Sequence, residues 1–182
     1  SEIREDFPMN DVLKAMKERR SIRAFKPDAV PAELIDQVIE AGLYAASGRN
    51  NQKSIIIAVT NKELRDRLSV LNQQIGGFPE GMDPFYGAPA VLIVLDDKNW
   101  PTNTYDGSLV MGNLMLAAHA IGLGSCWIHR AKEVFDSEEG KQILAELGIE
   151  GDYEGVGNCV IGYPEKMPTE KLPRKDGRVF FA

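Results

Sequence analysis

Residues 90–97 read AVLIVLDD, and this apolar run predicts a strand that is buried on both faces. Residues 54–60, SIIIAVT, are a second run of this kind, rich in β-branched side chains, and also predict a buried strand. Two shorter apolar runs, SCWIHR at residues 125–130 and GVGNCVIGY at residues 155–163, indicate two further strands. The sequence therefore predicts a sheet that needs cover from helices.

Helical patterns surround these strands. Their periodicity and end signals predict helices capped by Asn10 and Asn61, a helix that starts near Pro31, and helices at residues 106–121 and 137–147. The helix after Pro31 would bury a face made of Leu34, Ile35, Val38, Ile39 and Leu43. Because helices and strands alternate, we expect an α+β fold, a mixed α/β sandwich in which helices flank one sheet. Two helices precede the first strand, whereas a doubly wound nucleotide-binding fold opens with a strand.

The composition excludes several classes of protein. The chain has 182 residues, of which 43% are hydrophobic, and this suits one folded domain spanning residues 1–182. The net charge of −6 argues against nucleic-acid binding, which needs a broad basic face. No apolar run is long enough for a membrane span, and no N-terminal stretch has the layout of a signal peptide. The chain has only two cysteines, and they form no CxxC pair. Together with the lack of a signal peptide or membrane span, this predicts a cytoplasmic protein.

Hydrolytic, metal and dinucleotide motifs are not indicated. The chain lacks a GxSxG elbow and has two histidines, of which His119 lies in the apolar helix and His129 at a strand end, where it is open to a functional role. Cys126 and Cys159 lie in apolar strands, which favours inert buried thiols over metal ligands. The glycines of GLGSC, residues 122–126, follow a helix and precede a strand, so they are predicted to end that helix.

The stretch ERRSIRAF, residues 18–25, concentrates three arginines and a serine in this acidic chain. Arginine has forked donors that match a phosphate group, and serine adds a hydroxyl donor. Ile22 and Phe25 should point inward and fix the cluster beside the core. A preorganised anion site and a solvated helix end are both open on this evidence. The basic stretch KLPRKDGR, residues 171–178, either converges on the cluster or is a mobile tail.

The order and spacing of these motifs resemble the nitroreductase family of FMN-dependent oxidoreductases. The matching stretches are ERRSIRAF, AASGRNNQ at residues 45–52, GLGSCWI at 122–128, VIGYP at 160–164 and LPRK at 172–175. The resemblance covers nearly the whole chain and implies an intertwined homodimer with FMN at the interface. It also implies that the tail, residues 164–182, reaches the partner subunit, where residues 179–182 would add an edge strand.

The resemblance implies a set of cofactor-binding residues. Arg19, Arg20 and Ser21 match positions that hold the FMN phosphate and ribityl chain, with Arg174 as a late phosphate ligand. Arg23 matches the basic position at the flavin pyrimidine edge and would stabilise negative charge at N1 and O2, which makes it the one candidate catalytic residue.

Other positions of the site come from loops. Ser47, Asn50 and Gln52 match a loop that the partner subunit supplies, His129 and Arg130 fall where backbone N–H groups approach flavin N5, and Asn72 matches an asparagine on the flavin ring. Ala46, Lys53 and Ser54 depart from the proline and Pro-Trp positions that the family often has in the first of these loops. Any lid over the site must be formed by the 76–89 loop.

The function that the resemblance implies is a ping-pong reaction. NAD(P)H would deliver hydride to flavin N5, and a small acceptor, such as a nitroaromatic, a quinone or an activated alkene, would take it. Three alternatives stay open: a non-enzymatic FMN-binding or storage protein, a reductive dehalogenase or flavin-fragmenting relative, and an anion-sensing module without flavin.

Overall fold

The strand β2, Ala90–Asp97, is the centre of the fold, as its unbroken apolar sequence predicted. In this computed structural model, which describes residues 10–182, β2 pairs with β1 (Ile55–Val59) on one side and β4 (Tyr153–Gly162) on the other. β3, Gly124–Ile128, pairs with the far side of β4. The strand order is β1-β2-β4-β3 with antiparallel neighbours throughout, and Ser21 adds an isolated parallel bridge to β3.

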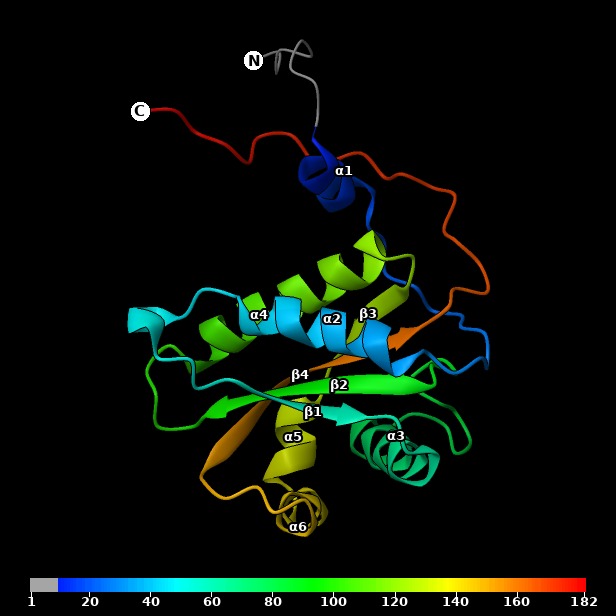
Figure 1. The fold of residues 1–182 in the computed structure, drawn as a ribbon, viewed down its shortest axis with the longest axis vertical. Helices are drawn as coiled ribbons and strands as arrows, with labels where there is room; N and C mark the ends of the chain where they lie inside the picture. The colour runs from blue at the N-terminus through cyan, green and yellow to red at the C-terminus, as the bar shows by residue number, and fades with distance from the viewer. Residues whose placement is uncertain (1–9) are drawn as a thin grey trace.

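Helices cover both faces of this sheet (Figure 1). One layer consists of α2 (Ala32–Leu43) and α4 (Asn103–Ala120). The other consists of α3 (Lys62–Gly76), α5 (Ala131–Asp136) and α6 (Glu138–Glu146). Two hydrophobic cores result, because alternate side chains of β2 point to opposite faces. Leu92 and Val94 pack beneath α2 and α4, whereas Val91, Ile93 and Leu95 pack against the other layer. The predicted α+β sandwich is confirmed.

Two predicted helix starts are confirmed by their caps, whereas the helix predicted from residue 106 begins earlier, at Asn103. The side chain of Asn10 accepts a hydrogen bond from the N–H of Leu13 and begins α1, Asp11–Glu18. The side chain of Asn61 accepts one from the N–H of Leu64 and begins α3. At the C-terminal end of α4, Gly122 has a φ of 85°, so it ends the helix as predicted.

Two local predictions were wrong, and one helix was not predicted. β1 is an edge strand with Ala58 exposed, so its isoleucine-rich run is only partly buried. Leu43 lies at the last position of α2 and is exposed, whereas Ile35 and Val38 are buried as expected. The short helix α5 was missed, because six residues are too few to show a helical period.

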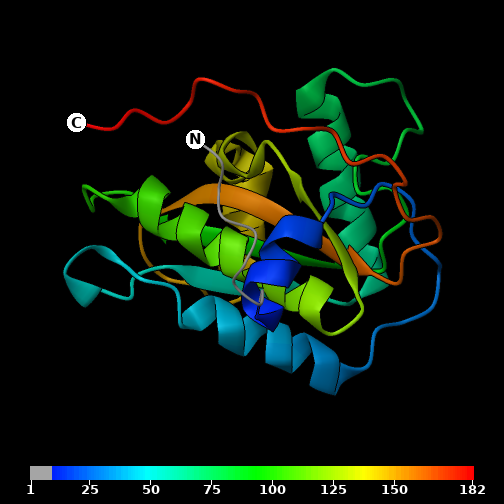
Figure 2. The same cartoon turned by 90° about the horizontal axis from the view of Figure 1, so that it is seen from above.

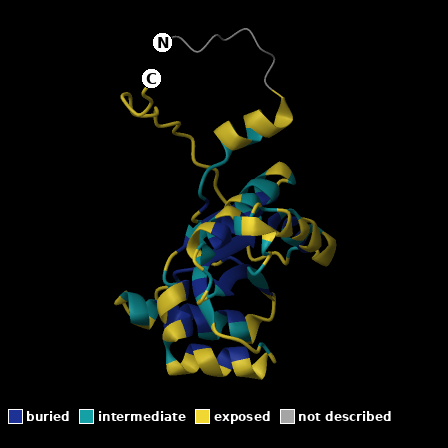
Figure 3. Cartoon of the chain, turned by 90° about the vertical axis from the view of Figure 1, so that its left-hand side faces the viewer, coloured by how far each residue is buried: buried dark blue, intermediate teal, exposed yellow. Residues whose placement is uncertain are grey.

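Both ends of the described chain carry exposed apolar side chains. α1 lies beside α4, away from the sheet, and has no buried residue (Figures 1 and 3). After Pro164 the tail has no regular structure, leaves the body of the molecule (Figure 2) and exposes Phe180 and Phe181 by more than 85%. Among residues 10–182, every helix is too short or too polar to cross a bilayer.

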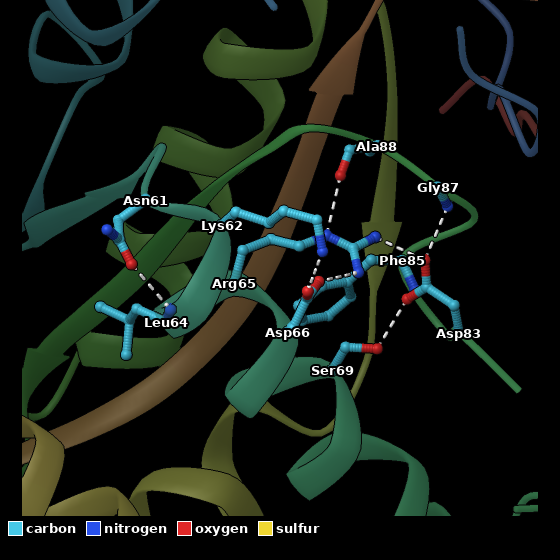
Figure 4. Close-up of polar contacts among 10 residues, drawn as sticks. All are labelled: Asn61, Lys62, Leu64, Arg65, Asp66, Ser69, Asp83, Phe85, Gly87 and Ala88. Atoms are coloured by element: carbon cyan, nitrogen blue, oxygen red, sulfur yellow. Dashed lines mark hydrogen bonds and ion pairs between the residues drawn. The ribbon is translucent and has the colours of Figure 1, made fainter. Parts of the chain in front are cut away.

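The 76–89 loop is fastened to α3 by a buried arginine (Figure 4). Arg65 donates from Nε to the Ala88 carbonyl at 2.9 Å and from Nη2 to the Asp83 carboxylate. Asp83 also accepts from the Ser69 hydroxyl at 2.6 Å and from the N–H groups of Phe85 at 3.0 Å and Gly87 at 2.8 Å. Burial raises the pKa of Asp83, but the bonds from Arg65, Ser69 and the backbone outweigh it and hold that pKa below 3.8.

Removing the Asp83 charge tests this anchor. Asp83→Asn should lower the free energy of unfolding by about 2 kcal/mol, because Arg65 would stay buried without its carboxylate partner. Asp66→Asn is the matched control: Asp66 also contacts Arg65 but is more exposed, so about 0–1 kcal/mol is expected. Denaturant unfolding followed by circular dichroism measures both, and equal losses would contradict the anchor.

The same variant predicts a pH dependence. The folded-state pKa of Asp83 is depressed, so its contribution is fully present above its ordinary value of 3.8 and is lost as the pH falls through the lower, folded-state value. The difference between wild type and Asp83→Asn should therefore be constant near neutral pH and shrink only below pH 3.8.

Candidate active site

The arginine cluster, residues 19–23, lies along the free edge of β3. Ile22 donates its N–H to the Ser125 carbonyl at 2.9 Å, and Phe25 forms a bridge with Pro164. Ile22 and Phe25 are buried, as the sequence predicted, and Arg23 between them is exposed. Because Ile22 and Phe25 are both fixed in the core, Arg23 is left on the solvent side of this segment.

Two polar atoms of this region are buried without a hydrogen-bond partner among residues 10–182. They are Nη1 of Arg19 and Oγ of Ser125. Arg20 behaves differently, because its Nη1 donates to the carbonyls of Lys17 and Arg19 at 2.8 Å each and closes the end of α1. A buried cationic donor without an acceptor is costly unless an anion supplies one. The cluster therefore has the chemistry of an anion site.

A cavity of about 220 Å³ lies next to Arg23. We call it the Arg23 cavity. Its wall combines four parts of the chain: the arginine cluster, the end of α3, the 76–89 loop, and β3 with the two residues that follow it. It is lined by Arg23, Asn72, Phe78, Met82, Pro84, Tyr86 and residues 126–130. The structure thus brings together four of the predicted site residues: Arg23, Asn72, His129 and Arg130.

The backbone at the floor of the Arg23 cavity is held by two asparagines. Asn72 is 1% exposed and donates from Nδ2 to the His129 carbonyl at 2.9 Å. Asn158 of β4 donates to the Ile128 carbonyl at 3.1 Å and to the His129 carbonyl at 3.3 Å. Arg130 follows with a φ of 79°, an uncommon conformation for a residue other than glycine. The N–H groups that follow β3 are therefore held in a fixed backbone geometry.

The 47–52 loop, which contains Ser47, Asn50 and Gln52, lies at the opposite end of the molecule from α3 (Figures 1 and 2). Ser47 accepts from the N–H of Gln52 at 3.2 Å, and Gln52 donates from Nε2 to Asn50 at 3.1 Å. The three residues are thus close to one another but not to the Arg23 cavity of their own chain. Arg174 lies in the exposed tail, and the pocket that it lines contains residues 174–179 and 181 only.

Asp106 of α4 anchors the 47–52 loop. It is 3% exposed and accepts from the Gly48 N–H at 2.9 Å, from Asn51 Nδ2 at 2.8 Å and from the Thr102 hydroxyl at 2.9 Å. Burial raises the pKa of Asp106, but the bonds from Asn51, Gly48 and Thr102 outweigh this effect and lower it. Asn50 and Gln52 have φ values of 52° and 53°, so the loop is strained and needs such an anchor.

Several site residues were missed from the sequence. Phe78, Met82 and Tyr86 come from the 76–89 loop, whose length was the only signal of a role. Ser125 and Asp106 each gave a usable signal, because a polar residue in an otherwise apolar strand or helix needs a partner. The two cysteines were assigned correctly as buried and free, and burial raises the pKa of Cys159 to about 12, which makes it an inert thiol.

Comparison with known proteins places these features in a family. The nitroreductase family model matches residues 16–75 and 79–163. An FMN reductase [NAD(P)H] of Bacillus subtilis is 31% identical over 92% of this chain and 72% of its own length. A putative NADH dehydrogenase/NAD(P)H nitroreductase of Methanothermobacter thermautotrophicus is 33% identical to this chain. The match covers 64% of this chain and 60% of that relative.

Solved structures agree with the sequence relatives. A nitroreductase with bound FMN from Bacteroides fragilis has a TM-score of 0.85 and 28% identity, with 96% of this chain and all of that chain covered. A nitroreductase with bound FMN from Desulfitobacterium hafniense has a TM-score of 0.86 and 26% identity over the same shares of the two chains.

The role of Asp106 can be tested on the purified protein. Asp106→Ala should lower the free energy of unfolding by about 2 kcal/mol, because the Gly48 and Asn51 donors would lose their acceptor. Hydrogen exchange should accelerate at residues 47–52. Asp97→Asn is the control, since Asp97 pairs with Lys53 beside the same loop but both side chains are partly exposed. Unchanged exchange in Asp106→Ala would show that the loop does not depend on this carboxylate.

Proposed function

The chain belongs to the nitroreductase family, and from this premise we propose that it passes hydride from NAD(P)H, by way of bound FMN, to a small acceptor. Membership supplies the class: the protein is an oxidoreductase with FMN as its cofactor and NAD(P)H as its reductant. The acceptor would be a nitroaromatic, a quinone or an activated alkene, and the two half-reactions would alternate in a ping-pong sequence. The observation that carries the proposal is the Arg23 cavity beside an anion-binding cluster.

The arginine cluster fits the phosphate end of FMN. The unpartnered Nη1 of Arg19 needs an anionic acceptor, and the hydroxyls of Ser21 and of the buried Ser125 add donors nearby on the same bridge. Arg20 would contribute charge while its Nη1 caps α1. Arg174 of the exposed tail would join them as a further basic residue at the phosphate.

The Arg23 cavity fits the ring end. Bound FMN supplies hydride transfer at its N5 atom. Arg23 would hold a fixed positive charge at the flavin pyrimidine edge, where negative charge collects on reduction. Asn72 orients the backbone of His129 and Arg130, whose N–H groups would approach N5. The 76–89 loop, with Phe78 and Met82 in the cavity wall, would exclude water from this side.

A homodimer would complete the site. The 47–52 loop lies far from the Arg23 cavity of its own chain, so Ser47, Asn50 and Gln52 would serve the cofactor of the partner subunit (Figure 1). The exposed apolar side chains of α1 and of the tail are the surface that such a partner would cover. In this proposal residues 1–182 form one FMN-binding domain, and residues 164–182 wrap the partner subunit.

Absorbance and stopped-flow mixing test the proposed function. The purified protein should show oxidised flavin bands, with FMN confirmed by mass, and NAD(P)H should bleach them under anaerobic conditions. A colourless protein that refuses added FMN would contradict the cofactor. A flavin that NAD(P)H does not bleach would indicate the storage alternative instead.

Two arginine variants separate the two ends of the site. Arg20→Ala should raise the dissociation constant for FMN by roughly 10-fold, the effect of about one charged hydrogen bond, and leave the reduction rate of the saturated protein within 2-fold. Arg23→Ala should slow flavin reduction by roughly 10- to 100-fold at FMN saturation. Lys17→Ala, a cation one turn earlier in α1, is the control for general charge loss. Equal reduction rates in wild type and Arg23→Ala would overturn the role of Arg23.

A further inference from the structure

The guanidinium of Arg130 lies at the Arg23 cavity and has no role in the proposed function, which uses only the backbone of this residue. Its side chain is half-buried and lies over the ring of Phe78, with Cζ 5.8 Å from the ring centroid. A side chain at position 76 would crowd it, since a Cβ there would lie 3.0 Å from the Arg130 Nε. Gly76 thus leaves room for the guanidinium, which lies over Phe78 of the 76–89 loop.

Within residues 10–182, the guanidinium of Arg130 has no carboxylate partner. The arginines of α3 itself differ: Arg65 pairs with Asp66 and Asp83, and Arg67 pairs with Glu139 and Glu146. Of the described residues, 10–182, none that lines the Arg23 cavity is Asp or Glu, although the chain has 27 acidic residues. A half-buried guanidinium with free donors is a binding element for a carboxylate or a phosphate.

The charges of the cofactor leave Arg130 unused. In the proposed function, Arg19, Arg20 and Arg174 bind the FMN phosphate, and Arg23 lies at the flavin pyrimidine edge. Arg130 lines the same cavity as Arg23, on the wall that the 76–89 loop forms with the end of β3. We infer that Arg130 is a specificity-determining residue that binds an anionic group, a carboxylate or a phosphate, on the substrate that enters the Arg23 cavity. This inference rests on the proposed function, because it assumes that substrates meet the flavin there.

Two substrates could carry the anion, and kinetics separates them. One arm compares 4-nitrobenzoate with the neutral 4-nitrobenzamide as acceptors at a fixed, saturating NADH concentration. The other compares NADPH, which has an additional phosphate, with NADH at a fixed neutral acceptor. Arg130→Gln should raise KM roughly 10- to 100-fold for the anionic member of one pair, and less than about 2-fold for its neutral or less charged counterpart.

Three further variants give the experiment its controls. Arg130→Lys keeps the charge but loses the planar fork, so it should recover part of the lost affinity. Phe78→Leu removes the ring that holds the guanidinium and should reproduce a smaller loss of the same selectivity. Arg67→Gln removes an arginine of α3 that lies outside the cavity, and it should leave both KM ratios unchanged. Each variant is compared at equal FMN content.

The outcomes distinguish the inference from the proposed function. If Arg130→Gln changes KM equally for charged and neutral members of both pairs, the inference is overturned and the proposed function stands. If the wild type reduces no acceptor, the proposed function fails, and calorimetric titration with benzoate and benzamide still tests the anion site. Benzoate binding that is tighter than benzamide binding in wild type, and equal to it in Arg130→Gln, supports the site. Equal binding in wild type overturns it.

Discussion

The burial of β2 on both faces is the constraint on which the rest of the structure depends. Residues 91–95 are fully buried, so a layer of helices must cover each side of the sheet. The strand also has neighbours on both edges, which leaves β1 and β3 as the outer strands. The free edge of β3 then accepts Ser21 and Ile22, and this pairing brings the arginine cluster beside the end of the same strand. A hydrophobic requirement at the centre of the sheet therefore decides where the polar site can form.

Each polar segment of the candidate site is held by a buried group from a distant part of the chain. The arginine cluster depends on the Ser125 carbonyl, the backbone after β3 on the Asn72 amide, and the 47–52 loop on the Asp106 carboxylate. The free-energy cost of burying such a group is offset only when all its hydrogen bonds form. Each group therefore selects a single loop conformation. Rigid loops suit the family's chemistry, because a preorganised site loses little free energy to reorganisation when charge develops.

The sequence predicted the parts of this structure that depend on local signals. The β2 strand, the Asn10 and Asn61 caps and the inward direction of Ile22 all follow from neighbouring residues. The edge position of β1 and the exposure of Leu43 could not be predicted, because they depend on which elements lie alongside. The Asp106 anchor joins residues 58 positions apart in the chain, and nothing local at Gly48 reveals its partner. For the site, the ordered motifs identified candidate residues, and their roles stay predictions. The structure brings four of these residues together in the Arg23 cavity.

The charge of the chain and the charge of the cavity have opposite signs, and the distance over which charges act reconciles them. The net charge of −6 is spread over a surface where salt largely screens interactions between charges more than about 10 Å apart. Inside the Arg23 cavity the local charges dominate, because solvent is partly excluded and the part of the chain that the structure describes places no carboxylate in the wall. A fully cationic protein would attract polyanions without selection. An acidic protein with one cationic cavity instead admits a small anion whose binding energy comes from a few directed contacts, as a single FMN and one anionic substrate would require.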